Sequence, residues 1–523
     1  MKRHRFFAFK ASSTLMVLAA LLSGCVVAPT ASEIFTKPDA AKGTVIAKAE
    51  GNRLAMLSSS WIGLRVKSNT TNKEYFIPNR LGLGPGAPGL FLGNPRHIFV
   101  SQLEPDSYSL IGIEGTFTGL LTDWMLNNLA HVKAGDSLGT FKVEAGKLTN
   151  LGTLFAFYPS KAEASRKFAV ARINTSDAEL RGAMQRVAPE ALPILQNTKH
   201  LGWNESPMDG KALLETARAN SYAVGSAFVD EGGSYWVGGQ TGQIIKRSPS
   251  GQWIQFDTGY LMPVNEARPI GNGLVVAGLE DGIVLIGNEK IGWKNHPLPH
   301  PGSVVAVGQL SNGDLVAVTG DKQIQVFTSS CCNDIDWKLA YTAPMEGSWF
   351  LGAVITPQAV LAIKVTPGIP PRRTVYRYSV SKNVWTAEDV KGATFMPHVG
   401  LDKSTICIGE AYSPDSGESW SLMDQPGFVL ACRDSRNIYS KKVAKMGWSY
   451  NDFALHWSTN KGKDWTQITD KLPDGAHQIE FLPDTNQLLV RSQTGKIYTS
   501  SDHGQSWVLE RSVNDTASPL ISK

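Results

Sequence analysis

Short apolar runs separated by turn-forming residues recur along most of this chain. Runs such as Ile62–Val66 and Tyr108–Ile113 are bounded by Gly, Pro, Asn and Asp, which is typical of β-strands. Later runs such as Leu274–Ala277 hold consecutive apolar residues, and this indicates strands that are covered on both faces. The pattern therefore predicts an all-β chain.

One stretch departs from this pattern. Ser176-x-x-Glu179 is a capping box that opens a helical segment, and two prolines limit the segment. We expect a helical linker over residues 176–211. It would join a β-sandwich domain over residues 46–175 to a larger β domain over residues 212–515. A short C-terminal tail over residues 516–523 would follow.

One short motif, Ser-x-Asp/Asn-x-Gly-x-x-Trp, occurs three times towards the end of the chain. Its Asp or Asn can fold back onto backbone N–H groups, and its Gly takes a conformation that a Cβ would resist. Its Trp starts the returning strand and offers the largest apolar area for packing. These residue types predict a repeated hairpin corner, made by Ser413, Asp415, Gly417 and Trp420, by Ser458, Asn460, Gly462 and Trp465, and by Ser500, Asp502, Gly504 and Trp507.

Trp residues that follow a polar turn also recur before these corners. Successive members of the series lie 35 to 48 residues apart, which is the length of a four-stranded propeller blade. The series predicts a seven-bladed β-propeller over residues 212–515, with its marks at Trp253, Trp293, Trp337, Trp385, Trp420, Trp465 and Trp507.

The corners resemble the Asp-box, or BNR, repeat of sialidase-like β-propellers, sortilin-type receptors and photosystem assembly factors. The resemblance implies that each box lies at the propeller rim, on the face away from the ligand site. Asp415, Asn460 and Asp502 are then structural residues, as their turn chemistry also predicts. The stretches Leu103–Tyr108 and Val143–Lys147 separately resemble small prealbumin-like sandwich modules of envelope proteins.

The first residues predict that the protein is located in the cell envelope. A basic opening and an apolar run over Leu15–Leu22 indicate a signal peptide over residues 1–24, too short for a membrane span. Leu22-Ser23-Gly24-Cys25 resembles the bacterial lipobox, which implies acyl chains such as palmitate on Cys25 and a lipid bilayer as partner. An ordinary signal peptide with an accidental Cys is the alternative.

By the same resemblance, Val26 favours the outer membrane, facing the periplasm or the cell surface, and residues 25–45 form a lipidated tether. Residues 1–24 carry four basic and no acidic side chains, so their removal lowers the formal net charge from +5 to +1. The basic balance of the whole chain therefore gives no support for a nucleic-acid partner.

Four cysteines remain besides Cys25. Cys407 and Cys432 are expected on strands of neighbouring blades and could form a bridge, while Cys331 and Cys332 are adjacent and could form a vicinal disulfide. Buried free thiols are the alternative to both pairings.

No catalytic, metal-binding or cofactor-binding motif is recognisable in the chain. By resemblance, a sialidase needs converging arginines, a Tyr nucleophile and a Phe/Tyr-Arg-Ile-Pro motif before the first box. Ala267-Arg268-Pro269-Ile270 scrambles that motif. The proline-rich stretch over 365–373 ends with Arg372 and Arg373 and forms either a contact loop or a plain long hairpin.

These observations favour a non-enzymatic, lipid-anchored envelope protein whose propeller is a binding scaffold for a protein or glycan partner. The alternative is a glycan-active enzyme, a sialidase-like hydrolase or a lyase, that acts in the propeller funnel. Acidic side chains that converge with arginines in the funnel would favour the enzyme.

Overall fold

The computed structural model of the protein describes most residues between 38 and 521. The gaps fall at residues 52–59, 81–96, 117–131, 134–137, 158–168, 198–199, 206–213, 216, 219–222, 322, 333, 369–370, 392–396, 425, 446–451, 474–477, 483–486, 493–494 and 513–519. The expected lipidation site and signal peptide lie outside the described residues.

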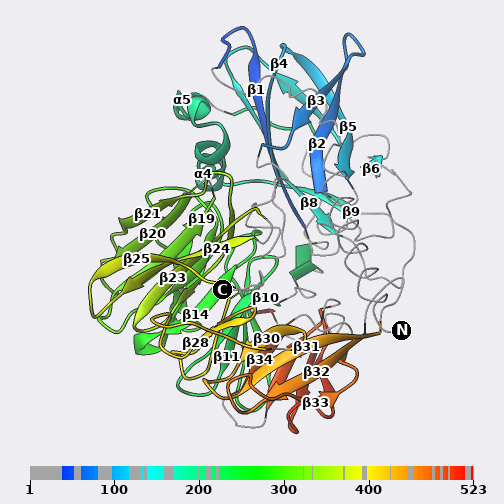
Figure 1. The fold of residues 1–523 in the computed structure, drawn as a ribbon. Helices are drawn as coiled ribbons and strands as arrows, with labels where there is room; N and C mark the ends of the chain where they lie inside the picture. The colour runs from blue at the N-terminus through cyan, green and yellow to red at the C-terminus, as the bar shows by residue number, and fades with distance from the viewer. Residues whose placement is uncertain are drawn as a thin grey trace, which may run out of the picture.

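Two sheets built from residues 43–173 enclose one apolar core (Figure 1). Val45 and Ala47 of one sheet pack with Leu64, Val66 and other buried residues of the second. In the first sheet the order is β4 (His97–Leu103), β1 (Gly43–Gly51), β8 (Leu148–Phe157) and β9 (Ala169–Ile173), with β1 parallel to β8. The second has the order β3 (Glu74–Pro78), β2 (Ser60–Ser68), β5 (Asp106–Thr116) and β6 (Val132–Lys133), and β7 (Thr140–Val143) pairs with β5.

A helical segment covers the outer face of the first sheet. It comprises α4 (Asp177–Val187), η1 (Pro189–Ala191) and α5 (Leu192–Asn197). The predicted capping box is confirmed, since the Glu179 amide donates to Ser176 Oγ and the Ser176 amide donates to the Glu179 carboxylate. Leu180 and Met184 pack against β1 and β4, so the helix belongs physically to the N-terminal domain.

Seven sheets follow in the described residues, each with four antiparallel strands from one continuous segment, and the first also receives a parallel fifth strand from the C-terminal end of the chain. We number them sheets 1 to 7 in chain order. They are β10 (Ala223–Val229), β11 (Tyr235–Gly239), β12 (Gln243–Arg247) and β13 (Trp253–Asp257); β14 (Glu266–Ile270), β15 (Leu274–Gly278), β16 (Val284–Asn288) and β17 (Gly292–Asn295); β18 (Val304–Gln309), β19 (Leu315–Gly320), β20 (Gln323–Ser329) and β21 (Lys338–Pro344); β22 (Trp349–Ile355), β23 (Ala359–Thr366), β24 (Arg372–Ser379) and β25 (Val384–Asp389); β26 (Pro397–Val399), β27 (Ile406–Ile408), β28 (Ala411–Ser413) and β29 (Ser421–Leu422); β30 (Phe428–Cys432), β31 (Ile438–Lys445), β32 (Asp452–Ser458) and β33 (Thr466–Thr469); and β34 (Gln478–Phe481), β35 (Leu488–Arg491), β36 (Ile497–Ser500) and β37 (Val508–Arg511). A short helix, η2 (Gly271–Gly273), joins β14 to β15, and β38 (Leu520–Ile521) pairs with β13.

The first strand of each sheet lies next to the first strand of the following sheet, and apolar clusters fill the space between neighbouring sheets. Sheet 7 meets sheet 1 through Leu489 and Ile497, which pack with Val237 and Ile245. The all-β prediction is confirmed, and this succession of four-stranded sheets is that of a β-propeller.

The predicted Trp series marks the fourth strand of every sheet. Each member reaches back to the preceding sheet, so that a single indole joins two sheets. Trp253, Trp337, Trp420 and Trp465 donate their Nε1 hydrogens to Glu510, His296, Glu388 and Asp424, whereas Trp293, Trp385 and Trp507 pack with Phe256, Tyr341 and Leu455.

Candidate functional site

A cavity of about 880 Å³ lies where the first strands of the sheets come together. Side chains two residues apart on a strand point to the same side of the sheet, so alternate residues of these strands face the cavity. Polar and aromatic side chains that line the cavity include Phe228, Glu266, Arg268, Gln309, His398 and Glu480.

The cavity is lined by turns from the same edge of the propeller as the repeated corners. In a four-stranded antiparallel sheet, the turn between the first two strands and the turn between the last two lie at the same edge. Here Thr356, in the turn between the first two strands of sheet 4, donates from Oγ1 to Ser416 Oγ in the first corner of sheet 5 (3.1 Å). The Ser416 amide also donates to the carbonyl of Ser404, which lies in the turn between the first two strands of sheet 5 (2.8 Å). The resemblance implies a ligand site on the opposite face, so this cavity does not lie at the position that the resemblance implies.

Arg268 supplies the buried cation of the cavity. Its Nη1 donates to the carbonyl of Ile355 (2.6 Å), and its guanidinium carbon lies 4.4 Å from the centre of the Phe228 ring. Gly308 leaves room for this packing, because a Cβ there would lie 3.1 Å from Arg268 Nη1. Burial lowers the pKa of Arg268 although nearby Glu266 opposes this effect. Within the described residues, this is the one hydrogen bond the guanidinium makes.

Glu266 lies two residues before Arg268 on β14 and lines the same cavity. Its Oε1 accepts a hydrogen bond from the Val307 amide (3.3 Å). Burial raises the pKa of Glu266 to about 8, although Arg268 and the amide act in the opposite direction. The carboxyl group is therefore mostly protonated at neutral pH and can donate a hydrogen bond.

Glu480, the second buried acid of the cavity, is held by two neighbours. The Tyr235 hydroxyl and Arg491 Nη2 both donate to its carboxylate, and Arg491 also donates to the Gly225 carbonyl (2.5 Å). Burial raises the pKa of Glu480 despite the Arg491 charge. These bonds join sheet 7 to sheet 1, and each of the two carboxylate oxygens of Glu480 already accepts a hydrogen bond from the protein.

His398 is the remaining titratable group that matters for this cavity. Its ring packs edge-on against Phe481, with 5.8 Å between ring centroids. Burial, together with the charge of Arg491, lowers the pKa of His398 to about 4, so the ring is neutral at physiological pH. Nothing in the sequence singled out Glu266, Glu480 or His398; the signal available for the two acids was a polar residue two places away on a first strand, Arg268 for Glu266 and Gln478 for Glu480.

The three predicted corners adopt one shared geometry. In the first, Ser413 Oγ accepts from the Gly417 amide (2.8 Å) and Asp415 Oδ1 accepts from the Ser419 amide (2.8 Å). The second and third copies repeat both bonds at 2.8–2.9 Å. The glycines have φ of +74° to +95°, as expected, and the residue before each is also in the left-handed region. These residues close turns, and none of them lines the cavity.

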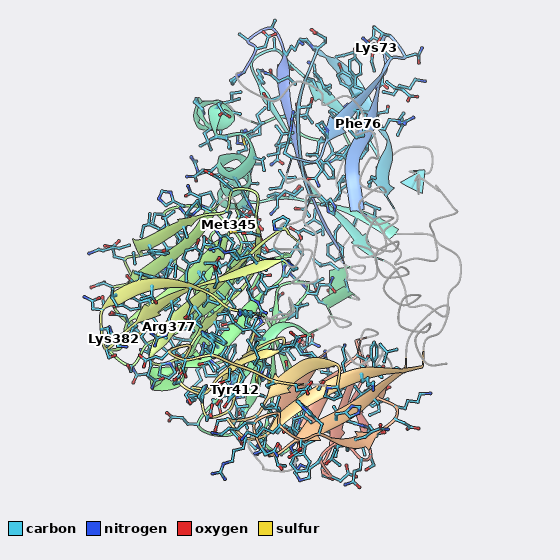
Figure 2. The ribbon with its side chains drawn as sticks, viewed as in Figure 1. Lys73, Phe76, Met345, Arg377, Lys382 and Tyr412 are labelled. Carbon is cyan, nitrogen blue, oxygen red and sulfur yellow. A yellow bond between two sulfur atoms is a disulfide. The ribbon has the colours of Figure 1, made fainter. Side chains whose placement is uncertain are left out.

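A neighbouring sheet supports the first corner from the side. Buried Arg377 of β24 donates from Nε to the Ser416 carbonyl (2.8 Å) and from Nη2 to Glu418 (3.2 Å). Lys382 donates to the same Glu418 oxygen (3.1 Å), and Figure 2 shows Arg377 and Lys382 near each other on the flank of the propeller. The corner is therefore part of a contact between sheets 4 and 5.

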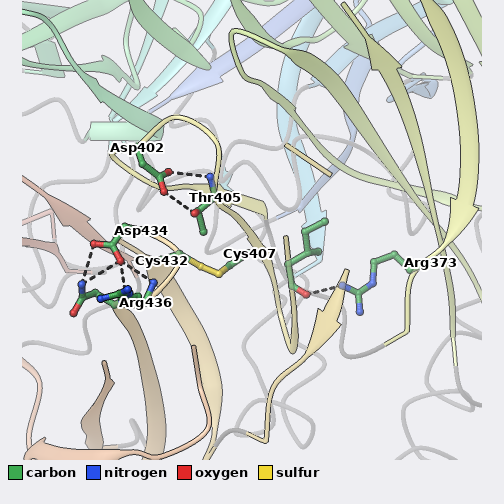
Figure 3. Close-up of a disulfide and its surroundings, with 9 residues drawn as sticks. Arg373, Asp402, Thr405, Cys407, Cys432, Asp434 and Arg436 are labelled. Atoms are coloured by element: carbon green, nitrogen blue, oxygen red, sulfur yellow. Dashed lines mark hydrogen bonds between the residues drawn. A yellow bond between two sulfur atoms is a disulfide. The ribbon is translucent and has the colours of Figure 1, made fainter. Parts of the chain in front are cut away.

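Both cysteine pairs are disulfides in the structure. Cys407 of β27 and Cys432 of β30 join sheets 5 and 6, with 6.1 Å between their Cα atoms (Figure 3). On either side of this bond, Asp402 and Asp434 accept hydrogen bonds from amides of their own turns, namely those of Thr405 and Arg436. Cys331 and Cys332 form the vicinal bond, in the sheet 3 corner that lacks the acid.

The two arginines of the predicted contact loop have different surroundings. The side chain of Arg372 is 69% exposed and pairs with Asp389 (2.6 Å). Arg373 is 2% exposed, and it donates to the carbonyls of Ile408 (2.6 Å, Figure 3) and Lys391 (3.2 Å). The expectation of a contact role is therefore wrong for Arg373, because its guanidinium ties sheet 4 to sheet 5 and does not reach the surface.

Two kinds of feature are absent from the described ranges. No group of three His, Cys, Asp or Glu side chains there could hold a metal ion. No helix in that part of the chain is long and apolar enough to cross a bilayer.

No family model matches this chain, and no curated protein matches it. Among solved structures it is similar to the tricorn protease, with 13% identity and a TM-score of 0.33 over 57% of this chain and 35% of that one. A structure described as YCF48 bound to D1 peptide has 16% identity and a TM-score of 0.38, over 51% of this chain and 90% of that one. YCF48 from Cyanidioschyzon merolae has 12% identity and a TM-score of 0.38, over 51% and 92%.

Fold and cavity together define the class of this protein. It is an all-β chain in which a two-sheet N-terminal domain precedes a β-propeller with a partly charged central cavity.

Proposed function

We propose that this chain is a non-enzymatic, lipid-anchored protein of the bacterial cell envelope, in which the propeller is a binding scaffold. The central cavity would receive part of a protein or glycan partner. The observation that carries the proposal is Arg268, a buried cation that faces the cavity beside a neutral Glu266. Such a cation favours a partner group that is negatively charged or rich in hydrogen-bond acceptors.

Binding fits the cavity better than catalysis because two of its polar side chains are already engaged by neighbouring protein groups. Glu480 is bound by Tyr235 and Arg491, and Gln309 accepts from the Gly271 amide and donates to the Gly313 carbonyl. General acid–base chemistry needs groups that can exchange protons with a substrate. A rigid cavity whose residues are held in place loses little conformational entropy when it binds.

A glycan-active enzyme is the second candidate, and the observation that favours it is the pair of buried acids in the cavity, Glu266 beside Arg268 and Glu480 bonded to Arg491. An acid with a pKa of about 8 is still protonated at neutral pH and could protonate a glycosidic oxygen. Turnover of any chromogenic glycoside that disappears in Glu266→Gln would establish this candidate and overturn the scaffold.

The scaffold is tested by crosslinking and affinity purification of the full lipidated protein from intact envelopes. We expect Arg268→Gln to lose most of the captured partner, whereas Arg65→Gln, which removes an exposed and paired arginine of the N-terminal domain, keeps it. Equal capture by both variants would exclude the cavity as the binding site.

The lipid anchor is proposed from the lipobox resemblance at Cys25. Cys25→Ser should abolish labelling of the protein by radioactive palmitate and release it from the membrane fraction. Retention of both properties would overturn the anchor but leave the cavity proposal intact.

A further inference from the structure

Charged side chains are buried where the N-terminal domain meets the propeller. Arg186, near the end of α4, places Nη1 3.2 Å from Glu280 and 3.3 Å from Asp281, and Nη2 2.5 Å from Asp321. Lys48 of β1 lies 3.6 Å from Asp281. The side chains of Arg186 and Asp281 are only 8% and 1% exposed. Elements of the N-terminal domain thus supply the cations, and the propeller supplies the carboxylates that they meet.

The propeller builds this acidic socket with its own residues. Glu280 and Asp281 occupy the turn between β15 and β16, and Asp321 occupies the turn between β19 and β20. Ser303 Oγ and Asn265 Nδ2 donate to Glu280 (2.6 and 3.1 Å), so its carboxylate is oriented from within the propeller.

The helix must also approach this turn closely. A Cβ at Gly182 would lie 3.1 Å from the Cβ of Asp281. Although burial lowers the pKa of Arg186, the three carboxylates raise it overall, so the guanidinium stays charged in the interface. A buried ion pair of this kind adds geometric specificity more readily than net affinity, because desolvation offsets much of the attraction.

We propose that Arg186 is an orientation lock, which holds the N-terminal domain in one fixed position against the propeller. The socket lies in turns between second and third strands, and these turns are at the edge opposite the corners and the turns that line the cavity. The lock therefore makes the cavity face away from the N-terminal domain. This inference does not depend on what the cavity binds.

The test measures the distance between two spin labels in the full chain, one at exposed position 73 of the N-terminal domain and one at position 382 of the propeller. We expect one narrow distance distribution in the parent protein. Arg186→Met should lower the ratio of docked to undocked molecules by about two to three powers of ten, because it leaves the buried carboxylates without their partner. Arg181→Met removes an exposed arginine from the same helix and should change nothing.

An unchanged narrow distribution in a folded Arg186→Met would overturn the lock. Should that variant not fold, Asp321→Asn replaces the most exposed of the three carboxylates, at 23%, and takes its place in the test. Broadening in Asp321→Asn supports the lock, and a distribution as narrow as that of the parent overturns it.

Discussion

The hydroxyl of Tyr235 in the first sheet of the propeller donates a hydrogen bond to the buried carboxylate of Glu480 in the seventh. Sheet 1 combines strands from both ends of the chain, because β38 from the C-terminal end pairs in parallel with β13. Side chains also hold the seam between sheets 7 and 1. Glu480, Arg491 and Tyr235 hold its inner part, while Trp253 and Arg247 bind Glu510 on the outside.

The seam should be sensitive to loss of the Glu480 carboxylate. Glu480→Ala leaves Arg491 buried without its charge partner, and we expect a loss of about 3–5 kcal/mol in the free energy of unfolding. Tyr235→Phe removes one hydrogen bond and should cost about 1–3 kcal/mol. Urea denaturation measures both, with exposed Glu346→Gln as a control expected within about 0.5 kcal/mol of the parent. A Glu480→Ala variant as stable as the control would show that the seam does not depend on this acid.

The raised pKa of Glu266 should make stability depend on pH. Between the ordinary value of 4.5 and about 8, the unfolded chain has lost this proton while the folded protein keeps it, so the free energy of unfolding falls as pH rises. Glu266→Gln has no titrating group at this position, so its free energy of unfolding should not fall for this reason as pH rises. We expect the variant to match the parent near pH 4 and to exceed it by about 2–4 kcal/mol near pH 8, measured by urea denaturation. Parallel pH profiles for the two proteins would contradict the assignment.

The second corner has Asn460 at the position that Asp502 occupies in the third corner, so Asp502→Asn copies a residue already present in an equivalent turn. Asn460 Oδ1 accepts from the Asp464 amide (2.9 Å), just as Asp502 Oδ1 accepts from the Ser506 amide (2.9 Å). Asp502→Asn keeps this acceptor and should therefore cost less at pH 7 than Asp502→Ala, which should cost about 1–2 kcal/mol. Thermal unfolding distinguishes these outcomes, and equal losses in both variants would show that the backbone bond contributes nothing.

The acid at this corner also predicts a pH effect. Burial acts to raise the pKa of Asp502, but the hydrogen bonds from Ser506 and Ser500 lower it to about 2. Its stabilising contribution is therefore complete above the ordinary value of 3.8 and is lost as pH falls towards 2. Asp502→Asn should lack this acid-dependent loss in a thermal unfolding series.

The disulfide between Cys407 and Cys432 should stabilise the contact between sheets 5 and 6. It closes a loop of 25 residues, and its removal by Cys407→Ser with Cys432→Ser should lower the free energy of unfolding by about 3 kcal/mol. Denaturation under non-reducing conditions measures this effect. The matched replacement of Cys331 and Cys332, which closes no loop of intervening residues, should cost less.

Local chemistry accounts for the parts of this protein that could be read along the chain. The capping box at Ser176, the corner turns and the Trp positions all depend on residues within a few places of one another, so their geometry follows from residue type and spacing. The cysteine pairings were open in the sequence, because whether two thiols meet depends on how neighbouring sheets are placed.

Only the tertiary structure decided the character of the cavity and of the interface between the domains. Arg373 and Arg268 are both strand arginines, yet packing between sheets buries the first against carbonyls and points the second into the cavity. The interaction of Arg186 with its socket joins residues up to 135 positions apart, Arg186 and Asp321, so no local sequence pattern predicts it. Residue type and short-range spacing thus determined the repeated unit, whereas the contacts among the closed ring of units and the docked domain determined which charges are paired and which face the cavity.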